Sequence, residues 1–143
     1  MSNINRTPCV LVCASCNASY PRLLQTGAII AGESGLGLQV LSILPKGPVD
    51  SSKSKFMQSL YDAAAISGAQ VTFLFSNEPS LTAAVHATKI GARHIVTGTP
   101  DVNSNLFLET IKALLPELPV SIVDADNRVY TFPPTKIPLL VRI

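Results

Sequence analysis

The chain has 143 residues, of which 47% are hydrophobic and only 14% charged, and its formal charge is 11 − 9 = +2. This length suits one domain with one core, but the charged fraction lies well below the ~25% usual in globular proteins. Basic residues are scattered, aromatic residues make up 6% and Trp is absent, so nucleic acid is not an expected partner. The low charge instead predicts a surface partly covered by a second copy of the chain.

Location is indicated by the apolar runs and the cysteines. No apolar stretch approaches the ~20 residues that span a bilayer, and the first run, residues 9–14, is too short for a signal-peptide core. The three cysteines are clustered in one segment and odd in number, which does not make a disulfide framework. We therefore expect a cytoplasmic protein without membrane insertion.

Short continuous apolar runs alternate along the chain with longer segments of helical period. Runs without in/out alternation are typical of strands that are buried on both faces of a parallel sheet. The predicted strands are residues 9–13, 38–44, 71–75, 94–97 and 120–123.

Four helices are predicted between these strands. Pro21 suits the first turn of the first helix and Gly35 its end, while Gly27 and Gly32 are expected to permit close packing on the sheet. The second helix ends at Gly68. The third runs from Pro79 to Gly91, and the fourth begins at a cap, Asn103 or Ser104, and stops at Pro116. The side chains predicted to face the core from the last two helices are Leu81, Ala84, Val85, Thr88, Leu106, Phe107, Ile111, Leu114 and Leu115.

This alternation predicts an α/β fold, a doubly wound five-stranded parallel sheet with helices on both faces and strand order 3-2-1-4-5. Ligands of such sheets bind at the switch point, here between strands 1 and 4, so residues 14–20 and 98–104 are the segments of interest. We expect residues 1–124 to form this domain. Residues 125–143 form a tail, in which 129–132 could return as an antiparallel edge strand before the break at Pro133 and Pro134.

Catalytic and metal motifs are weak. No phosphate loop or dinucleotide fingerprint occurs, His86 and His94 have no ligand-spaced partner, and no nucleophile–base set can be assembled, so we expect no enzyme and no metal site. Cys13-x-x-Cys16 leaves a thiol redox protein as an alternative. Its first cysteine belongs to a strand, however, and the helix begins only near Pro21, so the helix dipole would act weakly on Cys16.

Segments spread over residues 8–124 resemble the universal stress protein (UspA-like) superfamily. They are Val10-Leu11-Val12 as the first strand; Gly-Ala-Gln-Val at 68–71 before the third; Asn-Glu-Pro at 77–79, where the family often has Gly-Asp-Pro; Gly-Ala-Arg-His-Ile-Val-Thr-Gly at 91–98, similar to its Gly-Ala-Asp-Leu-Ile-Val-Met-Gly; and Leu-Pro-Val-Ser-Ile-Val at 118–123, similar to its Cys-Pro-Val-Leu-Val-Val. The resemblance implies that family's fold and a dimer through the last strand, with Val120, Ile122, Val129 and Tyr130 at the seam. The apolar tail after Pro134, residues 137–143, is the other segment that could form the seam.

The chain departs from the ATP-binding members of this family. Those continue from the glycine after strand 4 as Gly-x-x-Gly, nine residues and Gly-Ser/Thr, whereas this chain has Gly98, then Asp101 at the second glycine and no third. A carboxylate in a phosphate-binding nest repels the ligand. Ser15 also replaces the usual Asp after strand 1. The conventional ATP motif is therefore incomplete, and ATP, AMP or a cyclic dinucleotide all stay open as cofactors.

A closer resemblance is to the stress-protein-like domain of Kdp-type potassium-sensing histidine kinases. Ser15-Cys16-Asn17 falls at the Ser-x-Ser of those domains, while residues 38–42 stand in register with their Phe-Thr-Ala-x-Tyr and share none of its residues. This resemblance implies a non-catalytic regulatory or sensor domain that acts on a signalling partner and binds a nucleotide or cyclic dinucleotide. The alternative is a dimerisation module of the same fold that binds no small ligand. A nucleotide in the crevice would contact Ala14, Ser15, Asn17, Ser42, Gly98 and Thr99.

Overall fold

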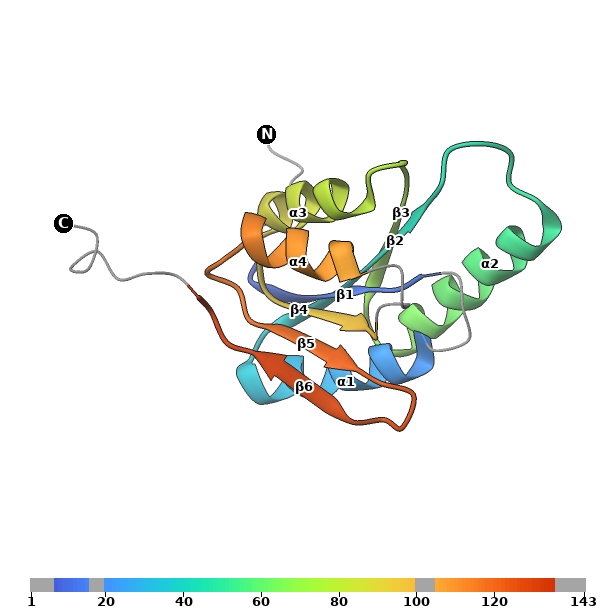
Figure 1. The fold of residues 1–143 in the computed structure, drawn as a ribbon. Coiled ribbons are helices and arrows are strands. Elements are labelled where there is room, and N and C mark those ends of the chain that lie inside the picture. The colour runs from blue at the N-terminus through green and yellow to red at the C-terminus, as the bar shows by residue number, and fades with distance from the viewer. Residues whose placement is uncertain (1–6, 16–19, 100–104, 136–143) are drawn as a thin grey trace, which may run out of the picture.

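The structure of the chain is a computed structural model, which describes residues 7–15, 20–99 and 105–135 (Figure 1). The strands are β1 (Cys9–Cys13), β2 (Gly37–Leu44), β3 (Gln70–Phe75), β4 (Ala92–Gly98), β5 (Val120–Val123) and β6 (Val129–Phe132). The helices are α1 (Tyr20–Ser34), α2 (Ser51–Ile66), α3 (Pro79–Ile90) and α4 (Asn105–Leu114). Every strand and helix predicted from the sequence is present, within a few residues at each end. The predicted caps of α4 lie outside the described residues.

All strands belong to one sheet, in the order β3-β2-β1-β4-β5-β6. Strands β1 to β5 run parallel, and β6 returns antiparallel to β5. The predicted α/β fold, the strand order and the additional edge strand are therefore confirmed. Within the part of the chain that the structure describes, no helix is long and apolar enough to cross a membrane.

The helices cover both faces of the sheet, so the strands are buried from two sides (Figure 1). Helices α1 and α2 enclose one core against side chains such as Val10, Val12 and Val40. Helices α3 and α4 enclose the other against the alternate side chains, among them Leu11, Leu41 and Ile95. This double burial is the reason why the strands read as continuous apolar runs.

Close packing of α1 on the sheet depends on one of its two glycines. A Cβ at Gly27 would overlap the Cγ2 methyl of Val12 and lie 3.1 Å from Cδ1 of Leu38, whereas a Cβ at Gly32 would have no neighbour within 4 Å. The prediction is confirmed for Gly27 and wrong for Gly32, which lies on the exposed side of the helix.

The inward face of α3 differs from the predicted one. The buried residues are Ala83, Ala84, Ala87 and Ile90, while Leu81 and Val85 are 46% and 59% exposed. Only Ala84 was assigned to the correct side. The three small alanines let the helix lie close to the sheet, and the larger side chains are turned outward. On α4, Leu106 and Leu114 are also exposed, in contrast to Ile111.

Strand β6 covers the edge of β5 and is held there from both faces of the sheet. On one face, the Lys112 ammonium lies 4.3 Å from the ring centroid of Phe132. On the other, Thr131 bonds to Ser121 of β5. Val120 and Ile122 are therefore buried rather than free for a partner, while Val129 and Tyr130 remain half exposed on the new edge.

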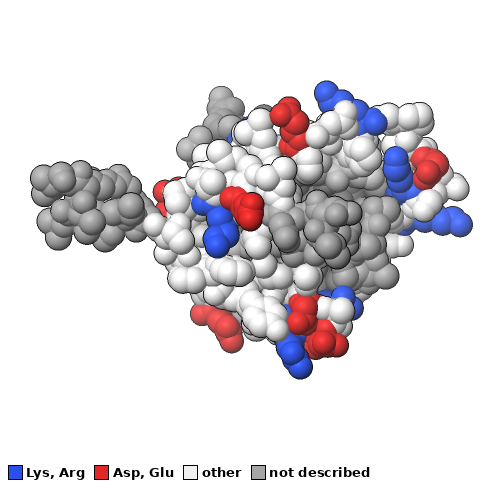
Figure 2. Space-filling model, viewed as in Figure 1, with Lys and Arg blue, Asp and Glu red and all other residues white. Residues whose placement is uncertain are grey.

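Charged side chains lie in small mixed groups on the face shown in Figure 2, with wide uncharged areas between them. No continuous basic stripe crosses the described part of that face.

Candidate functional site

The strands β1 and β4 part at their carboxyl ends. Cys13 is the last residue of β1 in register with β4, opposite Thr97. The Ala14 N–H then donates to the carbonyl oxygen of Leu41 in β2 (2.9 Å), and the Thr99 N–H donates to that of Val123 in β5 (3.2 Å). The segment after β1 thus turns toward β2 and the segment after β4 turns toward β5, which is the geometry of a switch-point crevice.

Five of the six predicted site residues lie at this edge. Ala14 is buried and Ser15 exposed after β1, Gly98 is half-buried at the end of β4, and Thr99 follows it. Ser42 comes from the neighbouring strand β2, one residue beyond Leu41. The sixth, Asn17, lies outside the described residues, as does Asp101.

Ser42 is the most unusual of these residues, because its side chain is 0% exposed and its Oγ has no hydrogen-bond partner among the described residues. Val40, two positions earlier, belongs to the core under α1 and α2, and alternation along the strand places Ser42 on the same face. Its register partner on β3 is Phe73. A buried hydroxyl without a partner costs about 1–3 kcal/mol, so its presence calls for an explanation.

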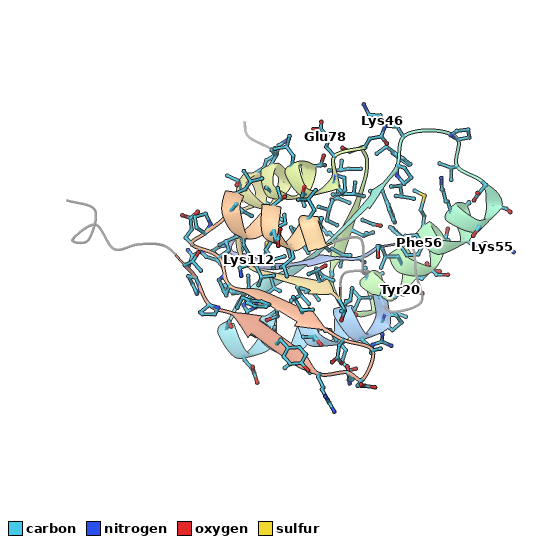
Figure 3. All side chains as sticks on the ribbon, viewed as in Figure 1. Tyr20, Lys46, Lys55, Phe56, Glu78 and Lys112 are labelled. Carbon is cyan, nitrogen blue, oxygen red and sulfur yellow. The ribbon has the colours of Figure 1, made fainter. Side chains whose placement is uncertain are left out.

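An aromatic pair closes the core on this face. The rings of Tyr20, the first residue of α1, and Phe56 of α2 meet edge to face with centroids 5.9 Å apart (Figure 3). Both pack in the same core as Ala14 and Val40. The pair fixes the first turn of α1 at the carboxyl edge of the sheet, beside α2.

Thr99 already makes two hydrogen bonds within the protein. Both its N–H and its hydroxyl donate to the carbonyl oxygen of Val123, at 3.2 and 3.3 Å. A ligand held by Thr99 would have to replace these bonds or use the lone pairs of the hydroxyl oxygen. The structure therefore brings Thr99 to the predicted edge but gives it a structural role there.

The described thiols are poorly suited to redox chemistry. Cys13 is a free cysteine, and burial raises the pKa of its thiol to about 12. Burial also raises the pKa of the Cys9 thiol. Since the thiolate is the reactive form, both groups are protonated and unreactive near neutral pH. Cys16, the other half of the predicted pair, lies outside the described residues.

A contact between His94 and Ser121 was missed by the sequence reasoning. Nε2 of His94 lies 2.7 Å from Oγ of Ser121, which in turn lies 2.7 Å from Oγ1 of Thr131. Burial lowers the pKa of His94. The pair has the composition of a base and a nucleophile, but Ser121 is 0% exposed and cannot meet a substrate. It links β4, β5 and β6 instead.

Asp124, which follows β5, also has a structural role. Oδ1 of Asp124 accepts bonds from the N–H groups of Asp126 and Arg128, both at 2.9 Å, and shapes the turn before β6. The bond from Arg128 is the main reason why the pKa of Asp124 is lowered. In the ranges that the structure describes, no group of three or more His, Cys, Asp and Glu side chains could hold a metal ion.

A doubly wound α/β domain whose polar residues gather at the switch point is a ligand-binding type of fold. No protein-family model matches the chain, and no curated protein sequence matches it. Solved structures do: a universal stress protein from Archaeoglobus fulgidus is 20% identical with a TM-score of 0.65, covering 82% of this chain and 93% of that one.

Two further structures agree. The universal stress protein from Archaeoglobus fulgidus in complex with dAMP is 19% identical, with a TM-score of 0.63 over 82% of this chain and 98% of that one. A protein of the universal stress protein family from Burkholderia pseudomallei is 19% identical, with a TM-score of 0.62 over 82% and 96%. This chain therefore has the universal stress protein fold, which confirms the resemblance at the level of the fold.

Proposed function

We propose that this chain is a non-catalytic regulatory or sensor domain of the universal stress protein type, which binds a nucleotide at the carboxyl ends of β1, β2 and β4. The observation that carries the proposal is the enclosed Ser42 hydroxyl without a partner, one strand away from the switch point. A donor and acceptor group held in an apolar core at that position suits the edge of a base or a sugar hydroxyl.

The comparison supports the ligand class, because one protein of the same fold was solved with dAMP. For this chain we propose an adenine nucleotide, ATP or AMP, or a cyclic dinucleotide. Because Ser42 has no exposed surface, binding requires the side chains above it to move. The non-catalytic role is supported by the burial of Ser121 and the high pKa of Cys13. We place the protein in the cytoplasm, where it would act on a signalling partner.

The test is a thermal-shift screen with dAMP, AMP, ATP and cyclic di-AMP, followed by calorimetry. A ligand at 100 times its Kd adds about 2.7 kcal/mol to the unfolding free energy, so a rise of Tm by several degrees is expected for at least one of them. Ser42→Ala should abolish that rise, because it removes the hydroxyl and adds no atom to the buried site. Thr88→Ala, on the exposed side of α3, is the matched control. If none of these nucleotides raises Tm at millimolar concentration, the proposal is wrong.

We also propose a homodimer, now through the outer edge of β6 rather than through β5. The four residues of β6 contain no Lys or Pro that would block pairing, and Val129 and Tyr130 are 45% and 49% exposed. Light scattering at tens of micromolar should give the mass of two chains, and Val129→Lys should give one. Ile66→Lys, at the 88% exposed end of α2, should leave the dimer intact. A single-chain mass for the unmodified protein contradicts the dimer.

A further inference from the structure

Four large apolar side chains on α3 and α4 are left uncovered by the described residues. Leu81 and Val85 belong to α3, and Leu106 and Leu114, which are 70% and 45% exposed, belong to α4. The two helices contact each other on the same face of the sheet (Figure 1). We call these four residues the α3–α4 face. Large apolar side chains that gather on a surface mark a site where another segment or molecule binds.

The two α3 residues lie on the outer side of the helix, next to α4. The Thr82 hydroxyl donates to Oγ of Ser76 at 2.7 Å, and Ser76 follows β3, so the flank with Thr82 is turned toward β3. Each residue advances about 100° around the helix. From Thr82 the turn therefore passes the sheet side, reaches buried Ala84 and comes next to Leu81, toward α4 and solvent. Val85 lies one turn further along the same outer stripe.

The two α4 residues lie on the side of that helix nearer α3. The Lys112 ammonium lies 4.3 Å from the ring centroid of Phe132, so the flank with Lys112 is turned toward β6. Leu114 is turned about 200° from Lys112 around the helix, and Leu106 about 120° in the opposite sense. Both are therefore directed away from β6. The α3–α4 face is thus one apolar surface along the line where the two helices meet.

The described chain ends at the foot of this face. The Thr135 N–H donates to the carbonyl oxygen of Pro116 (2.8 Å), two residues beyond Leu114, so the chain leaves the fold beside the end of α4. Residues 136–143, outside the described residues, follow directly. Eight residues in extended form reach about 26 Å, whereas the ten residues of α4 span about 15 Å. The segment is therefore long enough to pass the whole face.

The composition of this segment matches the face. Every second side chain is large and apolar, so an extended chain presents them on one side: Ile137, Leu139, Val141 and Ile143. The segment has two positive charges, on Lys136 and Arg142, and no acidic residue. Such a segment can cover apolar side chains if acidic groups lie near its positive ones.

Two exposed carboxylates border the far end of the face. Glu78 immediately precedes α3, where its side chain makes no capping bond (Figure 3). Glu109 follows Leu106 by three residues on α4, so the two are neighbours on the helix surface. Arg142 is seven residues from Thr135 and reaches about 23 Å in extended form, which is the distance of the helix beginnings. The charges of segment and face are therefore complementary.

We infer that residues 136–143 dock along the α3–α4 face of their own chain, with the apolar side on the four exposed side chains and Arg142 near the two carboxylates. A segment that starts at the foot of its binding surface has an effective concentration in the millimolar range, which favours its own chain over a second copy. The surface is separate from the nucleotide site, since Ser42 belongs to the core on the other side of the sheet.

The experiment is a titration of a fluorescently labelled synthetic peptide, with the sequence of residues 136–143, with full-length protein, followed by anisotropy. In the unmodified protein the face is occupied by the protein's own segment. In the double variant Leu139→Asp with Val141→Asp that segment cannot dock, so this variant should bind the peptide at least tenfold more tightly than the unmodified protein. Adding Val85→Asp to the variant should weaken peptide binding tenfold or more. Adding Ile66→Asp, at the exposed end of α2 on the other side of the sheet, is the matched control and should change nothing. Melting curves establish that each variant folds.

The inference is overturned if the unmodified protein binds the peptide as tightly as the double variant, or if the double variant does not bind it at millimolar concentration. It also fails if Ile66→Asp weakens binding as much as Val85→Asp, since the effect is then one of net charge. Light scattering should give the same number of chains per particle for the unmodified protein and the double variant. Fewer chains in the double variant would show that the segment crosses to a second copy, which contradicts docking on its own chain.

Discussion

Two serines on the same face of the sheet, Ser42 in β2 and Ser121 in β5, are both 0% exposed but have opposite surroundings. Oγ of Ser121 lies 2.7 Å from His94 on one side and 2.7 Å from Thr131 on the other. Oγ of Ser42 has no partner within the described chain. The residues are chemically identical and equally buried, so the difference between them lies entirely in what each hydroxyl contacts.

The comparison separates a structural side of the sheet from a candidate ligand side. On the β4–β5–β6 side, the chain of hydroxyls and imidazole satisfies its own members and attaches the antiparallel edge strand. On the β1–β2 side, the protein leaves a donor and acceptor without a partner at a cost of about 1–3 kcal/mol. A buried polar group that does not stabilise the fold is best explained by a ligand or an ordered water molecule.

Ser121→Ala should show the largest effect. The change removes the partner of the half-buried His94 ring, and it should lower the unfolding free energy by about 2 kcal/mol, measured by urea denaturation. Thr131→Val removes only the bond between Thr131 and Ser121, and the Ser121 hydroxyl keeps its bond to His94. This substitution should therefore lower the unfolding free energy by less. An unchanged midpoint for Ser121→Ala would show that the three-residue chain contributes nothing to stability.

Ser42→Ala is the same substitution on the other side and should have the opposite sign. Without a partner to lose, the variant should be as stable as the unmodified protein or up to about 1 kcal/mol more stable, in the same denaturation experiment. Its affinity for nucleotide should decrease. A loss of stability as large as that of Ser121→Ala would mean that the Ser42 hydroxyl has a partner, and the contrast between the two serines would disappear.

The architecture was predictable because the strands of a doubly wound sheet are apolar throughout and their order is restricted by chain handedness. The errors arose where side-chain size decided the packing. Leu81 and Val85 fit a helical stripe equally well on either side of α3, and only the close approach permitted by Ala83 and Ala87 turned them outward. Gly32 likewise looked the same as Gly27 in the sequence, but only Gly27 faces Val12.

The candidate site was predictable in place but not in detail. The switch point follows from the strand order and led to Ala14 and Gly98, whereas Ser42 was chosen from the register of residues 38–42 with the strand-2 motif of the Kdp-type domains. Contact of these residues with a ligand stays a prediction. The burial of Ser42 and the partners of Thr99 could not be predicted, since they depend on register between strands. For the same reason the pairing of His94 with Ser121, 27 residues apart in the chain, was missed.

The smallest expected effect is a difference in pH dependence between the two sides. Burial lowers the pKa of His94 below its ordinary value of 6.5, so the folded protein binds fewer protons than the unfolded chain at mildly acidic pH. The stability that this gives is complete above pH 6.5 and is lost as the pH falls through the lower pKa of the folded state. His86 contributes in the same direction, through burial first and then repulsion by Lys89.

Urea denaturation at pH 7.5, 6.5 and 5.5 should therefore show a decreasing unfolding free energy in the unmodified protein. His94→Gln, whose amide can still bond to Ser121, should show a smaller decrease. His86→Gln should remove the part of the decrease that comes from His86. Ser42→Ala is the control from the opposite side: no imidazole bonds to Ser42, so its pH dependence should match that of the unmodified protein. The lowered pKa of Asp124 acts only below its ordinary value of 3.8 and does not interfere in this range.

An equal decrease in His94→Gln would show that the ring is as accessible to protons in the folded protein as in the unfolded chain. In that case the His94–Ser121–Thr131 chain would be open to solvent rather than part of the core.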